Sequence, residues 1–467
     1  MEINLQEYEK IKESYKPVIP CDEVLSDEEK KLDEYLIRIK KEADVRYKEG
    51  NPYGIVEWND EEDIDPELYR FCKLLPKGGD LHTHDNVTIS YDRFEQMVID
   101  NMIISLEEDS YGTLYTKNSS DIPANSLNVN EALEKGIISR KQLSDLLLLT
   151  DQDGSTGYWK KLEQLFTAVG DTYNDVAFLE KMYEEGFRGS YERGVDLIEV
   201  RDYGSDDDLM NIIRTRTLRE AYYRVRRDHP DLVVRIIGCS GKDSTSSVEE
   251  SVDTLRSMIR VSKLVKDEFD PENVEDFIIG LDMVNEEDSS KPLSEFAEFL
   301  TSDEVKESGL GLYLHCGESL RRDNDTVVDA WLMDSTRVGH ALNLYRYPKV
   351  MEEYSKKPIP IEVCLMSNYR LNYVKDLRLH PGLIYMIFGI PIVLCSDDGL
   401  FMSRQPMVDD FYSAILCWDL ELANIKAICR NSIKYSGLSE KEISRIMKNW
   451  EAKWDNFVSE FLKSIKV

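Results

Sequence analysis

Short apolar runs recur along the chain from residue 78 onward, and longer amphipathic stretches separate them. Eight such runs occur, at residues 78–84, 194–200, 232–239, 277–284, 310–316, 336–342, 359–365 and 390–396. Nearly continuous apolar runs are typical of parallel strands covered on both faces, and the helical stretches between them indicate βα units. The pattern therefore predicts an α/β protein built on a TIM-type (β/α)8 barrel.

Helical patterns flank the predicted barrel on both sides. Near the N-terminus Ser26 and Glu29 form a capping box, and apolar residues follow at helical spacing: Leu32, Tyr35, Leu36, Ile39 and Ala43. This apolar stripe must dock either on the main body of the protein or on a second copy of the chain. After residue 409 the pattern predicts extra C-terminal helices, with three packing anchors: Trp418, Trp450 and Trp454.

These elements divide the chain into two parts. Residues 1–70 are expected to form an N-terminal helical extension, and residues 71–467 the barrel domain. The gap between the first two predicted strands is too long for an ordinary crossover. We therefore expect inserted helices at about residues 100–190, over one end of the barrel.

Histidines gather at the ends of the predicted strands. His82 and His84 end the first strand, His315 ends the fifth and His340 the sixth, while Asp397 and Asp398 follow the eighth. Active sites of such barrels lie at the C-terminal ends of the strands, so these side chains are expected to converge. His229 and His380 lie elsewhere, and we expect a surface loop for the first and a helix start beside Pro381 for the second.

The spacing of the first histidine pair points to a metal ion. His82 and His84 are two residues apart on a strand, so their side chains point the same way and both can reach one ion. A third histidine and a carboxylate would complete the protein ligands and leave one position for water, as in a catalytic zinc site. Glu318 follows His315 across Gly317, so we expect it beside the metal as a proton carrier rather than a ligand.

Charge and composition narrow the range of partners. The chain has 90 acidic and 58 basic residues and a formal net charge of -32, which repels phosphate backbones and anionic lipids, so neither nucleic acid nor a membrane is expected as a partner. The N-terminal stretch MEINLQEYEK lacks the pattern of a secretory signal, and the eight cysteines show no CxxC spacing. We therefore expect a cytoplasmic protein with reduced cysteines.

Several motifs, taken together and in order, resemble those of the adenosine deaminase family, most closely its adenosine deaminase growth factor branch. They cover roughly residues 70–440 and are LPKGGDLHTHD, LHCGES, RVGHAL, EVCLMSN, DLRLHP and SDDG followed by DDFY. The resemblance implies a barrel with one zinc ion per chain. It also implies conversion of adenosine, and of deoxyadenosine, to the 6-oxopurine nucleoside and ammonia.

The resemblance further implies a role for each matching residue. The zinc ligands would be His82, His84, His315 and Asp397. Glu318 would protonate purine N1, His340 would orient the attacking water and help to remove its proton, and Asp397 could also orient that water. Asp85 would bind the ribose and Asp398 the purine, and the loop that carries Asp282 and Asn285 would contact the purine.

Some positions depart from the family pattern and leave alternatives open. Asn285 stands where a Gly is usual, Gly399 and Leu365 replace Pro, and Ala341 replaces a frequent Gly. The first two lie near the base, so another aminopurine nucleoside, a nucleotide or a free base is an alternative substrate. A non-catalytic nucleoside-binding protein is a further alternative, and other divalent ions would also suit the ligands. The growth factor branch forms dimers through N-terminal helices, which makes the Ser26-capped helix a candidate for a homodimer contact.

Overall fold

The computed structural model describes residues 4–14, 19–49, 64–85, 88–149, 157–267 and 276–465. Part of the predicted N-terminal extension, residues 50–63, lies outside the described residues. The predicted boundary at residue 70 falls within helix α3 (Pro66–Leu74). Among the helices that the structure describes, none is both long and apolar enough to cross a membrane.

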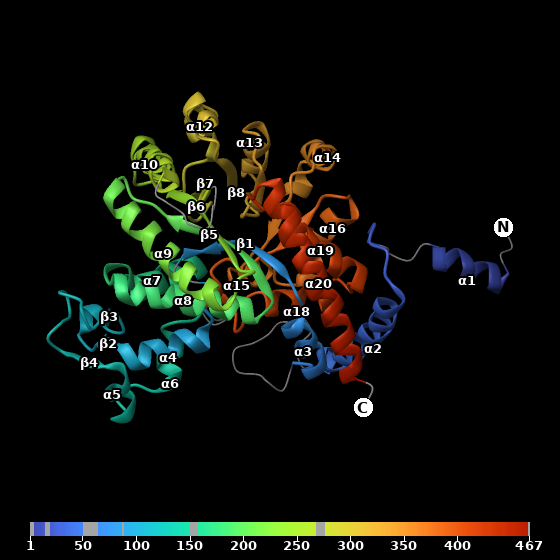
Figure 1. Cartoon of the computed structure of the whole chain (residues 1–467), viewed down its shortest axis with the longest axis horizontal. Coiled ribbons are helices and arrows are strands. Elements are labelled where there is room, and N and C mark those ends of the chain that lie inside the picture. The colour runs from blue at the N-terminus through green and yellow to red at the C-terminus, as the bar shows by residue number, and fades with distance from the viewer. Residues whose placement is uncertain are drawn as a thin grey trace.

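Eight parallel strands form a barrel at the centre of the molecule (Figure 1). In their order around the barrel they are β1 (Gly78–His84), β5 (Val195–Tyr203), β6 (Val233–Gly241), β7 (Ile278–Val284), β8 (Gly311–Cys316), β9 (Arg337–His340), β10 (Ile361–Val363) and β11 (Ile392–Leu394). Asp397, just beyond β11, closes the ring against β1, because its N–H donates to the carbonyl of His82 at 2.8 Å. The predicted TIM-type barrel and all eight predicted strands are confirmed.

Amphipathic helices connect the strands along the outside of the barrel. They are α9 (Asp208–Asp228), α10 (Val248–Asp267), α11 (Ala297–Leu300), α12 (Asp303–Ser308), α13 (Thr326–Leu332), α14 (Pro348–Lys356), α15 (Leu365–Arg370) and α16 (Pro381–Ile387). In α10, for example, Val252, Leu255 and Ile259 are buried and face the barrel side. The apolar spacing that predicts these helices is therefore the surface that they bury.

The long connection between β1 and β5 carries helices and a small sheet, seen in Figure 1 at one side of the barrel. Its helices are α4 (Tyr91–Asn101), α5 (Val129–Glu134), α6 (Arg140–Asp145), α7 (Tyr158–Val169) and α8 (Val176–Glu192). Three short antiparallel strands pair in the order β3 (Leu114–Thr116), β2 (Met102–Ser105) and β4 (Ser126–Asn128). The sequence predicted only helices here, because strands of three or four residues are too short to show a two-residue period.

The N-terminal helices differ in how they relate to the rest of the chain. Helix α2 (Asp27–Glu49) begins at the predicted capping box, and Leu32, Leu36 and Ile39 along it are buried. Glu29 also accepts a hydrogen bond from the indole of Trp454 at 2.7 Å. The stripe thus docks on the main body of its own chain. Helix α1 (Leu5–Ser14) projects away from the barrel in Figure 1.

The C-terminal helices complete the fold as predicted. They are α17 (Gly399–Met402), α18 (Val408–Cys417), α19 (Leu422–Lys434) and α20 (Glu440–Ser464). Trp418, Trp450 and Trp454 are buried, and the indole N–H of Trp450 donates to the carbonyl of Pro76 at 2.8 Å. Helix α20 therefore ties the segment that enters β1 to the N-terminal helix α2.

Candidate active site

Histidines and an aspartate from four strand ends meet at one mouth of the barrel. The ring centroids of His82 and His315 are 4.5 Å apart, and those of His82 and His340 are 5.0 Å apart. His340 and Asp397 have φ values of 62° and 57°, in the left-handed region that non-glycine residues rarely adopt. Such strain gathers at functional sites, where the surrounding structure holds it. Here it aims both side chains back into the mouth.

The converging groups form a donor set for a metal ion. Ligand atoms of His82, His315, His340 and Asp397 all lie within 4.8 Å of one another, and His84 forms a second such group with Asp397 and Asp398. The Nε2 atoms of His82 and His84 lie 3.5 and 3.2 Å from the same Asp397 oxygen, Oδ1. His340 Nε2 instead lies 4.0 Å from the other oxygen, Oδ2. Every residue of the predicted metal cluster is thus brought to one place.

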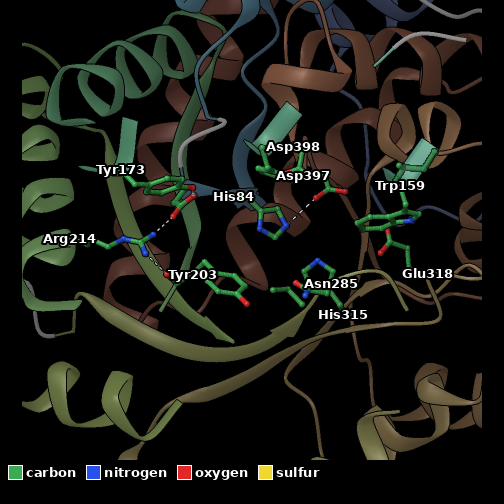
Figure 2. Close-up of a pocket in the computed structure, with 14 residues that line it drawn as sticks. His84, Trp159, Tyr173, Tyr203, Arg214, Asn285, His315, Glu318, Asp397 and Asp398 are labelled. Carbon is green, nitrogen blue, oxygen red and sulfur yellow. Dashed lines mark hydrogen bonds and ion pairs between the residues drawn. The ribbon is translucent and has the colours of Figure 1, made fainter. Parts of the chain in front are cut away.

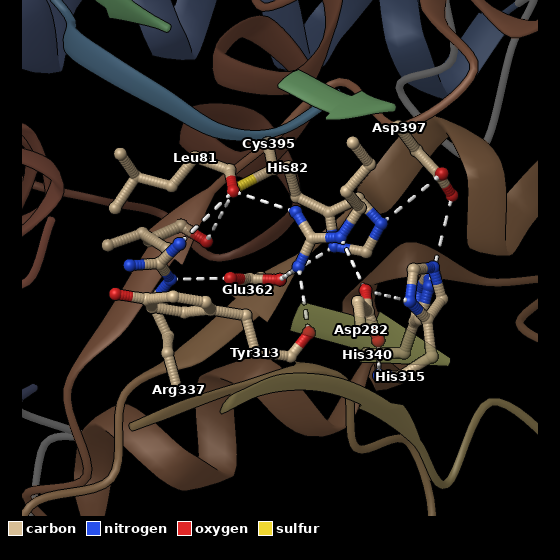
Figure 3. Close-up of polar contacts among 12 residues, drawn as sticks. Leu81, His82, Asp282, Tyr313, His315, Arg337, His340, Glu362, Cys395 and Asp397 are labelled. Atoms are coloured by element: carbon tan, nitrogen blue, oxygen red, sulfur yellow. Dashed lines mark hydrogen bonds and ion pairs between the residues drawn. The ribbon is translucent and has the colours of Figure 1, made fainter. Parts of the chain in front are cut away.

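Charged side chains inside the barrel orient two of these imidazoles (Figure 3). His82 donates from Nδ1 to Glu362 at 2.7 Å, and His315 donates from Nδ1 to Asp282 at 2.7 Å. Arg201 joins the two carboxylates, at 2.7 Å from Asp282 and 2.6 Å from Glu362. Such outer contacts fix which ring nitrogen is free to bind a metal. In both imidazoles that nitrogen is Nε2.

The site fits a divalent cation. The Nε2 atom of His82 is buried and has no hydrogen-bond partner among the described residues, an arrangement that is costly for a polar atom unless a ligand satisfies it. Imidazole nitrogens with a carboxylate oxygen are ligands that zinc and similar ions prefer. The residues present therefore match the chemistry of a bound metal.

The position of Asp282 differs from the one expected. The resemblance placed it among the groups that contact the substrate, but its side chain is fully buried and bonds to His315 and Arg201. Alternation along β7 turns it into the barrel interior rather than toward the mouth. Asp282 is therefore a support for His315.

Glu318 lies beside the metal cluster, as predicted. Gly317 has a φ of 63°, and a Cβ there would come within 2.5 Å of Asn343 Oδ1, so the tight turn that returns Glu318 to the mouth requires glycine. The Glu318 side chain is buried, 3.5 Å from His340 Nε2. Burial, and then the negative charge of Asp397, raise the pKa of Glu318 well above its usual range. This shift favours the protonated form of Glu318, which is the form that a proton donor needs.

A cavity of about 400 Å³ opens over the cluster (Figure 2). The residues that line it are His84, Asp85, Trp159, Phe166, Tyr173, Tyr203, Arg214, Val284, Asn285, His315, Glu318, Leu371, Asp397 and Asp398. Aromatic walls with a few convergent polar groups are typical of a site for a small planar ligand. The predicted residues Asp85, Asn285 and Asp398 all line this cavity.

The polar groups of the cavity wall are held in different ways. Asp85 accepts a hydrogen bond from the hydroxyl of Tyr173 at 2.6 Å and forms an ion pair with Arg214. Burial, with the charge of Asp397 adding to it, raises the pKa of Asp398 to about 7. Asn285 has a φ of 96°, which explains why glycine would be the easier residue at this position.

Sequence reasoning missed two groups of residues. The cavity walls Trp159, Phe166, Tyr173 and Arg214 come from the long insertion and from α9, and no motif marks them. The supports Arg201 and Glu362 did have a signal, because Glu362 is a charged residue within a run predicted to be a buried strand and Arg201 directly follows another such run. A charge at such a position indicates an internal partner.

A barrel with this cluster at its strand ends defines a metal-dependent hydrolase. The comparisons with known proteins then place it more narrowly: a sequence model described as adenosine deaminase matches residues 244–453. The chain is similar to the adenosine deaminase family, and it is a hydrolytic deaminase.

Similar proteins support this assignment along most of the chain. Adenosine deaminase 2 of Dictyostelium discoideum is 26% identical over 458 residues, which cover 92% of this chain and 82% of that protein. Adenosine deaminase 2-A of Danio rerio is 28% identical over 430 residues, which cover 85% and 82%. A solved amidohydrolase from Burkholderia ambifaria, with bound Zn, has the same fold, with a TM-score of 0.63 at 13% identity and coverage of 88% and 99%.

Proposed function

We propose that this deaminase hydrolyses adenosine and deoxyadenosine to inosine and deoxyinosine, releasing ammonia. The observation that carries the proposal is Glu318, a buried carboxyl group that lines the cavity beside the metal cluster and whose raised pKa favours its protonated form. The reaction needs such an acid, because attack of water at C6 of the purine places electron density on N1.

The proposed cofactor is one zinc ion per chain, held by His82, His84, His315 and Asp397. The two histidines of β1 approach the same oxygen of Asp397, and the outer carboxylates leave Nε2 of His82 and His315 free. When bound, zinc lowers the pKa of a water molecule and so supplies a nucleophile at neutral pH. The solved relative in fold that contains Zn also supports this choice.

The rest of the cavity supports a purine nucleoside. The base would lie against Trp159 and Phe166, near Asp398, whose Oδ1 is buried and has no partner among the described residues. Asp85, fixed by Tyr173 and Arg214, is the proposed acceptor for a ribose hydroxyl. Purine N1, the base edge near Asp398 and one ribose hydroxyl would then each meet a protein group held in place.

The charge of the cavity favours a nucleoside over a nucleotide. Among the described residues that line it, Arg214 is the only lysine or arginine, and its guanidinium pairs with both Asp85 and Asp202. A 5′-phosphate would therefore find no uncommitted lysine or arginine in the wall, and the nearby carboxylates would repel it.

A second candidate substrate is another aminopurine nucleoside, because the Asn285 side chain reaches the cavity where the family usually has glycine. Formation of the 6-oxopurine product tests both candidates on a panel of adenosine, deoxyadenosine, N6-methyladenosine, guanosine, adenine and AMP, with release of methylamine from N6-methyladenosine and of ammonia from the others. We expect kcat/KM for adenosine to exceed that for AMP by about 100-fold or more, the cost of about 3 kcal/mol for an unpaired phosphate.

Three outcomes of the panel would contradict the first choice. Turnover confined to a compound other than adenosine or deoxyadenosine would select the second candidate, and Asn285→Gly should then shift activity toward adenosine. Equal use of AMP would contradict the role given to Arg214. Stoichiometric binding of adenosine without turnover by zinc-loaded protein would indicate a non-catalytic nucleoside-binding protein.

Cytoplasmic residence and a homodimer are further parts of the proposal. All eight cysteines are free thiols, as is usual in a reducing compartment. For the dimer, α1 is the proposed contact, since Leu5, Tyr8 and Ile11 are 77%, 50% and 40% exposed and repeat every three residues along the helix.

A further inference from the structure

A chain of buried polar groups leads from His340 away from the cavity. It runs through Asn368 and His380 to the backbone of Gly382, at the start of α16. The side chains of Asn368 and His380 are as buried as that of His340, with 0% and 1% of their surface exposed. None of these groups except His340 lies in the cavity wall or the metal cluster, so the proposed function leaves them unused.

The backbone end of the chain fixes the direction of every hydrogen bond in it. The N–H of Gly382 can only donate, and it donates to His380 Nδ1 at 3.0 Å. Nδ1 of His380 therefore carries no proton. Burial lowers the pKa of His380 to about 3, so its imidazole is neutral at pH 7 and carries its single proton on Nε2.

The next bond orients the amide of Asn368. His380 Nε2 lies 3.0 Å from Asn368 Oδ1 and donates to it, since this nitrogen bears the proton. The Asn368 amide nitrogen, Nδ2, then faces Nδ1 of His340 at 3.3 Å. An amide nitrogen has protons and no free lone pair, so it donates. His340 Nδ1 must accept this bond.

We propose that Asn368 and His380 are positioning residues that hold His340 as a hydrogen-bond donor through Nε2. A neutral imidazole has one ring proton. If Nδ1 accepts a hydrogen bond, that proton is on Nε2. This inference rests on the proposed function, and it restricts the role of His340 in that function. The resemblance gives His340 a part in removing the proton of the attacking water, whereas a protonated Nε2 orients that water and cannot take its proton.

The surroundings of His340 Nε2 agree with a donor. Oxygen atoms of two carboxyl groups lie on this side of the ring, Glu318 Oε1 at 3.5 Å and Asp397 Oδ2 at 4.0 Å. In the proposed reaction the attacking water lies between these carboxyl groups and the ring. A donor Nε2 also excludes His340 from the metal ligands, since a nitrogen that carries a proton has no free lone pair.

Because His340 cannot take the proton of the attacking water, the proposal assigns Asp397 as the base. Water forms its bond to C6 as one of its protons passes to the Asp397 carboxylate, and Glu318 gives its proton to N1. The C6–N bond breaks as the departing amine takes the proton from Asp397 and leaves as ammonia. The new C6 hydroxyl returns a proton to Glu318, which leaves the 6-oxopurine with its N1 proton. His340 keeps its own proton throughout.

The direct test is the protonation of the His340 ring in the zinc-loaded protein. Histidine labelled with ¹⁵N gives signals that distinguish a nitrogen that bears a proton from one that does not, and the His340→Gln variant assigns the His340 pair. We expect a proton on Nε2 and none on Nδ1. A proton on Nδ1, alone or together with Nε2, would overturn the proposal.

An isosteric variant gives a second, kinetic test. Asn368→Asp replaces the donor that faces His340 by an acceptor, so the His340 proton should move to Nδ1. We expect kcat to fall by about 10²-fold, the scale of a lost group in proton-transfer catalysis, with KM changed less than about threefold. An unchanged kcat together with an unchanged His340 spectrum would contradict the role of Asn368.

Asn343→Asp is the matched control. Asn343 is also fully buried near His340, but its amide donates to the carbonyl of Asn324 at 3.1 Å instead. Its replacement should cost stability without moving the His340 proton. If Asn368→Asp fails to fold, the wild-type spectrum still decides the question. The wild-type spectrum also shows where the His340 proton lies if the protein turns over no nucleoside. Failure of the proposed function is therefore distinguishable from failure of this inference.

Discussion

At the scale of single residues, the site depends on side chains that hold other side chains. Asp282 and Glu362 each bind the Nδ1 of a histidine in the cluster, and Arg201 binds both carboxylates. All three are fully buried. Because the supports fix which ring nitrogens face the ion, changes to them should alter metal affinity without touching a ligand.

The variant Asp282→Asn tests this directly. It keeps the shape of the side chain but removes the charge that His315 and Arg201 contact, so the His315 ring loses its fixed orientation. We expect zinc affinity, measured by competition with a chromophoric chelator, to fall by about 10- to 100-fold.

Asp196→Asn is the matched control for Asp282→Asn. Asp196 is another buried aspartate paired with a cation, Lys453 at 2.8 Å. It lies near the N-terminal end of β5, whereas the metal cluster lies at the C-terminal ends of the strands. Equal losses of zinc affinity in the two variants would show that the effect is general destabilisation.

A buried neutral histidine makes stability depend on pH. The folded-state pKa of His380 is about 3, against 6.5 for the free side chain. Between these values the unfolded chain binds more protons than the folded one, so the free energy of unfolding falls as pH falls from 6.5 toward 3. One proton contributes a slope of up to about 1.4 kcal/mol per pH unit.

His380→Gln removes this contribution and should flatten the acid side of the stability curve. Urea unfolding of wild type and variant between pH 4 and 6.5 measures the two slopes. The difference in unfolding free energy between the proteins should shrink as pH falls. Parallel curves would show that His380 is not buried in its neutral form.

How much of the site the sequence could predict depends on the kind of residue. His82, His84, His315, His340 and Asp397 follow strands whose ends are visible as the ends of apolar runs, and barrel geometry then brings them together. The sequence resemblance placed Asp282 at the substrate because nearby residues, Val284 and Asn285, line the cavity. The direction of the Asp282 side chain instead depends on the alternation of side chains along β7. The tautomer of His340 depends on Asn368 and on a backbone N–H, and no local pattern shows which side chains will meet.

At the scale of elements, the predicted strands and helices carry strong periodic signals, and the insertion does not. The strands of the barrel are apolar on both faces, and the helices bury one stripe, so both signals persist over many residues. In the insertion, β2, β3 and β4 are three or four residues long. They share one hydrophobic core with Leu400 and Phe401 of α17, and a local pattern cannot reveal such a long-range association.

The N-terminal helices give a prediction at this scale. Since α2 is buried against its own chain, the exposed apolar face of α1 is the proposed surface for a second copy. A chain that starts at Ile19 should be a monomer by light scattering, and the full chain a dimer. Leu5→Glu combined with Tyr8→Glu should act like the deletion. A monomeric full chain, or a truncated chain that stays dimeric, would contradict the proposed contact.

At the scale of the whole molecule, charge and fold point to the same kind of substrate. The net charge of -32 sets up a field that slows the approach of phosphorylated compounds, and the cavity offers them no free lysine or arginine among its described lining residues. The barrel interior, by contrast, is charged but balanced, because Arg201 and Arg337 share Glu362 and Arg337 also pairs with Glu199. This buried network supports the strand ends on which the site is built.

The most direct test of the central claim is the loss of adenosine absorbance with zinc-loaded wild type and Glu318→Gln, with Glu353→Gln on the surface of α14 as control. We expect the wild type and the control to convert adenosine to inosine, and kcat of Glu318→Gln to fall by about 10²- to 10⁴-fold at unchanged zinc content. Adenosine left intact by the zinc-loaded wild type, or turned over equally well by Glu318→Gln, would contradict the account.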